Sequence, residues 1–173
     1  MDIINTHTNP KTTFEQVLYI DSRHAYSNPV SNVDFSVLFN YANDSKSSST
    51  PQVFKNVVSV ELTGLSLPAG HANNTNEHSV ILDIAELNDR LYSNIPHANQ
   101  SFAVLYTPTS SSQTTTMVKG MDFEGPKIKR FNPPLSSLNR LTIKILHPFE
   151  NKPIEDYGHT TMIFKITTEQ YMA

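Results

Sequence analysis

The chain has 173 residues, a net charge of −3, no Cys and no Trp, and only 17% of its residues are charged, against a usual share of about 25%. Uncharged polar residues fill the difference, since 51 residues are Ser, Thr or Asn. The slightly acidic balance lacks the basic footprint of a nucleic-acid-binding protein. The absence of Cys excludes disulfides, thiolate metal sites and thiol nucleophiles.

The length suits a single domain with one sizeable core. No apolar run approaches the roughly 18–20 residues of a transmembrane helix. Met1 to His7 has neither the charged nor the apolar region of a signal peptide, so we expect none. Three N-x-S/T triplets begin at Asn43, Asn73 and Asn99, and in a chain this rich in Asn, Ser and Thr we interpret them as chance occurrences.

Hydrophobic residues alternate with polar ones along the chain, which is the period of β-strands. Residues 33–39 and 58–63 both carry apolar side chains at every second position. Beyond Gly64 the apolar positions change phase, from even to odd numbers. A strand keeps its faces unless an extra residue is inserted, so Gly64 is predicted to mark a bulge or sharp bend at a sandwich corner.

Further segments complete a set of eight to nine predicted strands. The stronger ones are 79–84, 102–106, 141–146 and 162–166, and the weaker ones are 17–20, 115–119 and 127–131. One short helix is predicted at 85–91, where Leu87 and Leu91 share a face. Turn-forming residues separate the strands at 26–29, 46–51, 71–76, 108–113 and 132–134. Short strands joined by polar loops favour an all-β antiparallel sandwich or barrel.

A search for catalytic chemistry finds no recognisable constellation, so we assign no catalytic, cofactor-binding or metal-binding residue and no cofactor. The seven His residues have no metal-ligand spacing, and His71 and His78 near Glu77 are interpreted as loop residues. The five Gly residues cannot form a phosphate-binding loop. The aromatic residues are expected mostly on inner strand faces, as part of the core.

The most distinctive charged cluster is Asp21-Ser22-Arg23, directly after the strand at 18–20. It could grip a ligand, but we favour a structural role, in which Asp21 and Ser22 bond to the backbone and Arg23 pairs with a nearby carboxylate. Glu61 and Lys144 lie on the polar faces of strands, where cross-strand pairing or solvation is expected.

Several stretches together resemble the single jelly-roll capsid proteins of nucleocytoplasmic large DNA viruses, in particular the penton proteins. These stretches are 17–23, 31–37, 56–63 with the following Leu67-Pro68, and 131–148. They include Tyr-Ile-Asp-Ser-Arg after an early strand and the run Pro-Pro-Leu-Ser-Ser-Leu-Asn-Arg-Leu before a late one. The family commonly continues with Asp-Pro-Asp-Gly, whereas this chain has His147-Pro148-Phe149-Glu150-Asn151.

The resemblance implies an all-β fold, a single eight-stranded jelly roll with long polar loops and at most one short helix. We expect a flexible N-terminal arm over residues 1–14 and a single domain over 15–173. It also implies a non-enzymatic structural role in the virion of an icosahedral virus, assembled in the infected host cell. The expected form is a homopentamer at the fivefold vertices, contacting major capsid protein capsomers and other minor capsid proteins, without direct nucleic-acid contact.

Three alternatives remain open. A minor capsid protein lying under or between capsomers would share the same fold and motifs. A carbohydrate-binding jelly-roll module would need exposed aromatic residues, and the lack of Trp counts against it. A metal-dependent jelly-roll enzyme is disfavoured by the missing His-x-His spacing.

Overall fold

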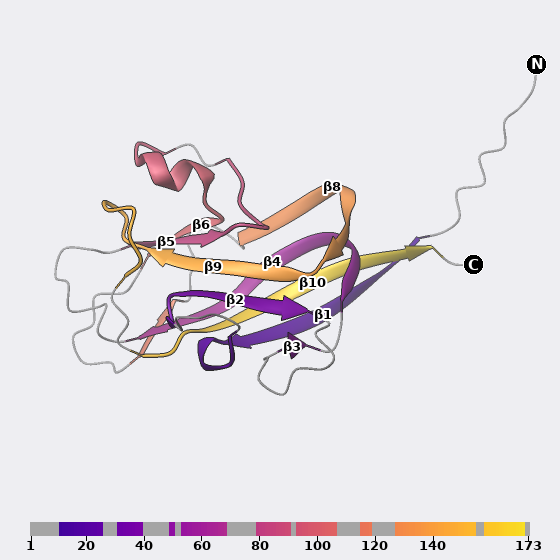
Figure 1. Ribbon diagram of the computed structural model, residues 1–173. Helices are drawn as coiled ribbons and strands as arrows, with labels where there is room; N and C mark the ends of the chain where they lie inside the picture. The colour runs from indigo at the N-terminus through magenta and orange to yellow at the C-terminus, as the bar shows by residue number, and fades with distance from the viewer. Residues whose placement is uncertain are drawn as a thin grey trace, which may run out of the picture.

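A computed structural model describes residues 11–25, 31–39, 49–50, 53–68, 79–90, 93–106, 115–118, 127–154 and 158–171 of the chain. The described part is almost entirely β-strand, arranged as two facing antiparallel layers (Figure 1). The strands are β1 (Lys11–Asp21), β2 (Asp34–Phe39), β3 (Ser49–Thr50), β4 (Phe54–Pro68), β5 (Ser79–Ile84), β6 (Ala103–Tyr106), β7 (Thr115–Val118), β8 (Lys127–Leu138), β9 (Arg140–Leu146) and β10 (Thr161–Tyr171). The described residues also form two short 3₁₀ helices, η1 (Ser22–His24) and η3 (Pro96–Gln100).

The order of the strands is that of a jelly roll. In the first sheet β10 lies between β1 and β4, and β4 pairs further with β8 and, nearer its C-terminal end, with the short β7. The second sheet has the order β2-β9-β5-β6, with the two-residue β3 added parallel to β2. Eight principal strands therefore form two four-stranded antiparallel sheets, which confirms the predicted fold class.

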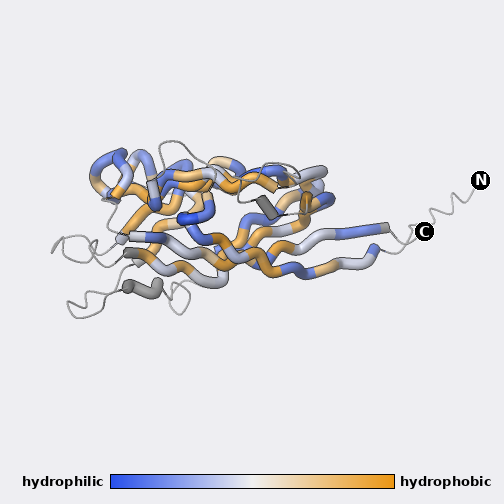
Figure 2. The backbone as a smooth tube through the Cα atoms, turned by 60° about the horizontal axis from the view of Figure 1, so that its bottom comes forward, coloured by the Kyte–Doolittle hydropathy of each residue, from blue (hydrophilic) through white to orange (hydrophobic). Residues whose placement is uncertain are grey.

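The core lies between the two sheets, where inward positions of both layers meet (Figure 2). In β2 the burial alternates along the strand, with Phe35, Val37 and Phe39 facing inward. The rings of Phe39 and Phe54 meet edge to face, with centroids 5.2 Å apart, and so join the second sheet to the first. The strand alternation seen in the sequence is therefore the alternation of core and surface.

The predicted irregularity at Gly64 is a β-bulge in β4. Ile163 of β10 lies opposite Gly64 and the next residue, Phe164, lies opposite Leu62, so Thr63 is the extra residue. The Thr63 hydroxyl donates a hydrogen bond to the Ile163 carbonyl oxygen (3.1 Å). The inserted residue shifts the buried positions from Val60 and Leu62 to Leu65 and Leu67, as the phase change in the sequence predicted.

The predicted helix at 85–91 is wrong, because its described residues, 85–90, form a turn after β5. The amides of Leu87 and Asn88 both donate to the Ile84 carbonyl oxygen, which completes one turn. The Asn88 side chain then accepts from the Ile84 amide (2.9 Å) and donates to Asp83 (2.6 Å). An Asn side chain that bonds the backbone in this way favours a turn over a continued helix.

The predicted turn at 132–134 is also wrong, since β8 runs through it as one strand. Leu135 pairs with Val57 and Arg130 pairs with Ser59. Residues 131–134 of β8 therefore lie opposite the single residue Val58 of β4. These four residues form an irregular bulge that contains both prolines. Because Pro lacks an amide hydrogen, it is tolerated in a strand at such a bulge.

Strand β1 begins at Lys11, four residues before the expected domain boundary, and residues 1–10 lie outside the described residues. Its register with β10 runs without interruption from Lys11 opposite Tyr171 to Asp21 opposite Thr161. The first part of this two-stranded ribbon extends past the second sheet (Figures 1 and 2). As a result Phe14 keeps 45% of its surface exposed.

Candidate functional site

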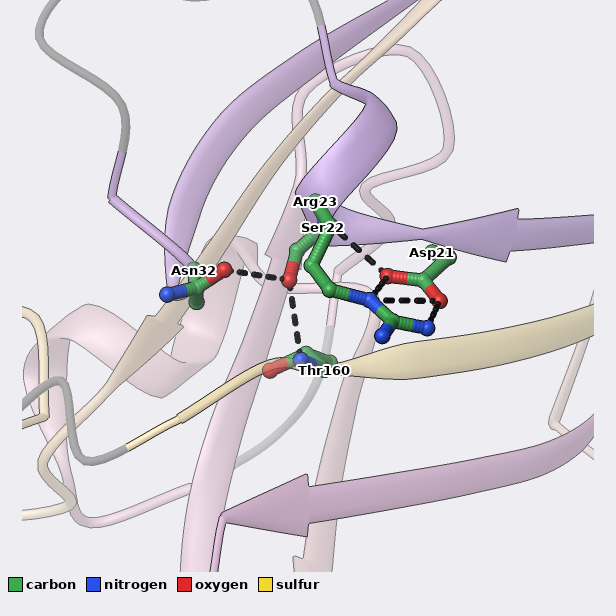
Figure 3. A network of polar contacts seen from close by, with 5 residues as sticks. All are labelled: Asp21, Ser22, Arg23, Asn32 and Thr160. Atoms are coloured by element: carbon green, nitrogen blue, oxygen red, sulfur yellow. Dashed lines mark hydrogen bonds and ion pairs between the residues drawn. The ribbon is translucent and has the colours of Figure 1, made fainter.

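The cluster Asp21-Ser22-Arg23 lies where β1 ends and η1 begins, and it forms a local network of polar contacts (Figure 3). The Asp21 carboxylate accepts from the Arg23 amide (3.0 Å) and from two nitrogens of the Arg23 guanidinium, with the shortest contact 2.5 Å. The structural interpretation of this motif is confirmed for Asp21 and Arg23. Their charges satisfy each other, so they do not form an open ligand grip.

Ser22 ties together three segments that are distant in the sequence. Its side chain is fully buried, and its hydroxyl donates to Oδ1 of Asn32 (2.7 Å) and accepts from the amide of Thr160 (2.9 Å). The Ser22 amide in turn donates to the Thr160 carbonyl oxygen (2.9 Å). Figure 3 shows the hydroxyl lying between Asn32, just before β2, and Thr160, just before β10. The motif therefore connects the end of β1 to the starts of β2 and β10 at one corner of the sandwich.

The Arg23 guanidinium holds the pKa of the Asp21 carboxyl at about 2, below its ordinary value of 3.8. The side-chain hydrogen bond from Arg23 is the largest cause, and nearby His159 adds a smaller contribution, while burial of the carboxyl opposes both. The same pair raises the pKa of Arg23. Asp21 is therefore an anion throughout the neutral range and has no proton to exchange in general acid–base chemistry.

A metal centre finds no support in the described part of the chain. No group of three or more His, Asp or Glu side chains there is arranged to hold a metal ion. His71, His78 and Glu77 lie outside the described residues, as do the triplets at Asn43 and Asn73. The third triplet begins in η3, where the Asn99 side chain accepts a hydrogen bond from the Ser93 amide (2.8 Å).

Glu61 and Lys144 both make cross-strand ion pairs, as predicted. Glu61 pairs with Lys165 of β10 (2.8 Å), and Lys144 pairs with Asp34 directly opposite it on β2 (3.7 Å). The carboxylate of Glu61 raises the pKa of Lys165, with a further contribution from Glu15. These residues lie on outer sheet faces and stabilise the sheets.

The feature that the sequence reasoning missed is an apolar patch on the outer face of the first sheet. Val17 is 75% exposed, Tyr19 is 60% exposed and Ile163 is 38% exposed. Tyr19 and Ile163 lie opposite each other in the register of β1 and β10, and Val17 is two residues before Tyr19 on the same face. We call these three residues the outer patch. Leu18 and Ile20 alternate with them, so this alternation was the signal that Val17 and Tyr19 face outward.

A further exposed aromatic residue lies on the loop between β9 and β10. Phe149 is 73% exposed, and the loop around it is held by hydrogen bonds from the His147 amide to the Lys152 carbonyl oxygen (3.0 Å) and from the Ile154 amide to the Ile145 carbonyl oxygen (2.9 Å). The expectation that aromatic residues lie mostly on inner faces therefore fails at Tyr19 and Phe149. Exposed aromatic residues on rigid elements are typical anchors of protein interfaces.

Among the residues that the structure describes, no helix has the length and apolarity that crossing a membrane requires. Neither a scan of protein-family models nor a search of curated proteins finds a match to this chain. The features that bear on function are therefore the fold, the polar corner around Ser22 and the two exposed apolar features.

Proposed function

We propose that the chain is a structural protein of an icosahedral large DNA virus capsid, and that it forms the homopentameric penton at the fivefold vertices. The single observation that supports this most is the jelly-roll strand order, with β1-β10-β4-β8 facing β2-β9-β5-β6. A fold by itself does not specify a function. The proposal therefore also draws on the motifs that resemble penton proteins.

The positions of these motifs support the proposal. The run Tyr19 to Arg23 closes the corner of the sandwich, where Ser22 joins the starts of β2 and β10. The run from Phe131 to Leu141 forms the bulged second half of β8 and its direct continuation into β9. Both runs thus build the scaffold. This suits a protein whose role is to hold a shape.

The surface supports the same class of function. Val17, Tyr19 and Phe149 are exposed on elements that are firmly hydrogen-bonded. An apolar side chain on a rigid element loses little conformational entropy when a partner covers it. We infer that these residues contact neighbouring subunits or capsomers in the assembled shell.

A minor capsid protein placed between capsomers is the main alternative, since it would use the same fold and surfaces. A carbohydrate-binding module gains one observation in its favour, the exposed ring of Tyr19 on a sheet face. Two neighbours of that ring, Val17 and Ile163, are apolar, although the charge of Arg23 also acts on Tyr19. The outer patch thus suits a protein partner better than a glycan, and binding to a glycan array would reverse this preference.

The assembly state of the purified chain tests the proposal. A fivefold ring has a mass of about 97 kDa, five times the 19.4 kDa of one chain, or a multiple of that mass, and should give fivefold class averages in negative-stain electron microscopy. Light scattering after size-exclusion chromatography gives the mass independently. A closed ring with another number of subunits would contradict the penton role and would favour the minor capsid protein.

A further inference from the structure

Strand β1 is a long edge strand that carries three charged residues, Lys11, Glu15 and Asp21, but has neither a bulge nor a proline to protect its edge. It pairs with β10 on one side through eleven consecutive residues with no bulge, and no described strand pairs with its other side. Residues 11–21 contain no Pro, and most of them are β-branched or aromatic residues or leucine. Natural sheet edges are normally shortened, bulged, charged or covered, because an open edge invites pairing with another strand.

We propose that two copies of this chain pair antiparallel through β1, about a two-fold axis at Gln16. In this register residue numbers of opposite partners add up to 32, so Lys11 faces Asp21 of the second copy and Glu15 faces its Val17. Gln16 is the midpoint of β1, so the whole strand from Lys11 to Asp21 is used by both copies. The contact joins the first sheets of two sandwiches into one continuous sheet.

The charges of β1 select this register over its neighbours. An axis at Glu15 would place the two Glu15 carboxylates opposite each other, and an axis at Leu18 would place Glu15 opposite Asp21. Like charges directly opposite in an antiparallel pair are destabilising. An axis at Val17 avoids this repulsion but pairs two fewer residues of each strand. The register about Gln16 alone combines full overlap with no like charges directly opposite each other.

The inward face of β1 points to the same register. Phe14, which the second sheet leaves 45% exposed, would lie opposite Leu18 of the second copy. The two Gln16 side chains would lie opposite each other at the axis. The Gln16 Oε1 atom is buried within its own chain and lacks a hydrogen-bond partner, and a change of the Gln16 rotamer at the axis would bring it to the amide group of a second Gln16. A buried acceptor without a partner is unfavourable, so pairing would relieve this cost.

This contact goes beyond the proposed penton function, because a two-fold contact closes at two copies while a ring needs a head-to-tail contact. The two contacts have different symmetry and are measured separately. Edge pairing alone gives a dimer, and edge pairing together with a fivefold ring gives ten chains. In both cases the number of copies is even and falls by half when the edge is blocked.

A pair of charge variants at Val17 tests the register. Val17→Glu places a carboxylate opposite Glu15 of the second copy at two symmetric positions, and we expect the dissociation constant to rise at least about fivefold. Val17→Lys places a cation opposite the same Glu15 and should leave the affinity unchanged or tighter. Within one chain the order is reversed, because Val17 lies opposite Lys165. A simple loss of folding would therefore affect Val17→Lys more than Val17→Glu.

Sedimentation equilibrium of the three proteins measures these affinities. An even number of copies for the native chain, with weakening by Val17→Glu only, supports edge pairing. Equal weakening by both variants, or a native chain with an odd number of copies at 100 µM, overturns it. Fivefold class averages of the native chain test the penton proposal separately, because they report the ring and do not depend on the two-fold contact.

Cysteine cross-linking gives an independent test, because the chain has no Cys of its own. With Gln16→Cys the two thiols meet at the axis, where Cβ atoms of opposite residues are about 4.5–5.5 Å apart, so mild oxidation should give a covalent dimer. The matched control Lys11→Cys places its thiols about 33 Å apart along the strand and should not cross-link. A mixture of Thr13→Cys and Tyr19→Cys proteins should form the mixed dimer. Equal yields from Gln16→Cys and Lys11→Cys would refute the pairing.

Discussion

The buried hydroxyl of Ser22 is the most informative position at which to test how this fold is held together. Ser22→Ala removes one oxygen atom and leaves every other side chain in place. The hydroxyl donates to Asn32 and accepts from the Thr160 amide, with distances of 2.7 and 2.9 Å, and the side chain has no solvent access. Without the hydroxyl, Asn32 just before β2 and Thr160 just before β10 would each lose one hydrogen bond.

The cost of Ser22→Ala follows from the groups left behind. A buried donor or acceptor without a partner costs roughly 1–3 kcal/mol. The Thr160 amide is buried and should account for most of this cost, whereas Asn32 is only half-buried and makes another interaction. We therefore expect the free energy of unfolding to fall by about 2–3 kcal/mol, a large fraction of the 5–15 kcal/mol typical of a domain.

Equilibrium urea unfolding followed by circular dichroism measures this change. The matched control is Ser36→Ala, because Ser36 faces outward on β2 and its loss should change stability by no more than about 0.5 kcal/mol. A Ser22→Ala protein as stable as the Ser36→Ala protein would refute the argument. It would mean that the corner is held by strand packing alone.

Three further predictions concern single positions. Thr160→Val should stabilise the chain by roughly 1 kcal/mol, because the Thr160 hydroxyl is buried without a hydrogen-bond partner and a methyl group of the same shape avoids that cost; a lower urea midpoint would contradict this. Asp21 has a folded pKa of about 2 against 3.8, so its stabilisation is present above pH 3.8 and is lost as the pH falls from 3.8 towards 2. Asp21→Asn should therefore lower the free energy of unfolding by about 1–2 kcal/mol at neutral pH and should flatten the fall of that free energy between pH 3.8 and 2, as measured by urea unfolding at several pH values. An unchanged dependence of stability on pH would show that Arg23 does not stabilise the carboxylate. Asn56 has a backbone φ of 51°, in the left-handed region, so Asn56→Val should lower the thermal midpoint at a cost of about 1–2 kcal/mol while Asn56→Gly should not; equal midpoints for the two variants would contradict the strain argument.

The sequence predicted the sandwich because successive side chains of a strand point to opposite faces, so apolar residues at every second position mark the buried face. The alternation at 33–39 became the buried and exposed faces of β2, and the phase change at Gly64 became a bulge. The pair of Asp21 and Arg23 was also predictable, since these two residues interact with each other and with backbone close by, whereas the bonds of Ser22 to Asn32 and Thr160 were not. Local rules suffice where the partners are local.

The errors arose where a distant partner decided the local structure. Glu86, on the predicted helix, accepts from the Thr142 amide (2.7 Å) and hydroxyl (2.9 Å) of β9, so its side chain extends the sheet beyond the end of β5. The turn after β5 is also anchored by Lys129 of β8, whose ammonium pairs with Asp89 (3.0 Å). The spacing of residues within 85–91 does not predict these contacts, because both partners belong to strands that come much later in the sequence.

The shortage of charge in the sequence gains a structural meaning from the pairs that the charged residues make. Much of the charge on the described strands is neutralised within the chain, in the pairs Lys11–Glu169, Lys165–Glu61, Lys129–Asp89 and Arg140–Glu86. A surface whose ions are already paired can approach a partner without stripping water from isolated charges, which is the costly step in burying an ion. Where the ion pairs stop, the first sheet presents Val17, Tyr19 and Ile163 instead. We infer that this sheet is built to be covered, and that the low charge and the outer patch are two aspects of the same adaptation to assembly.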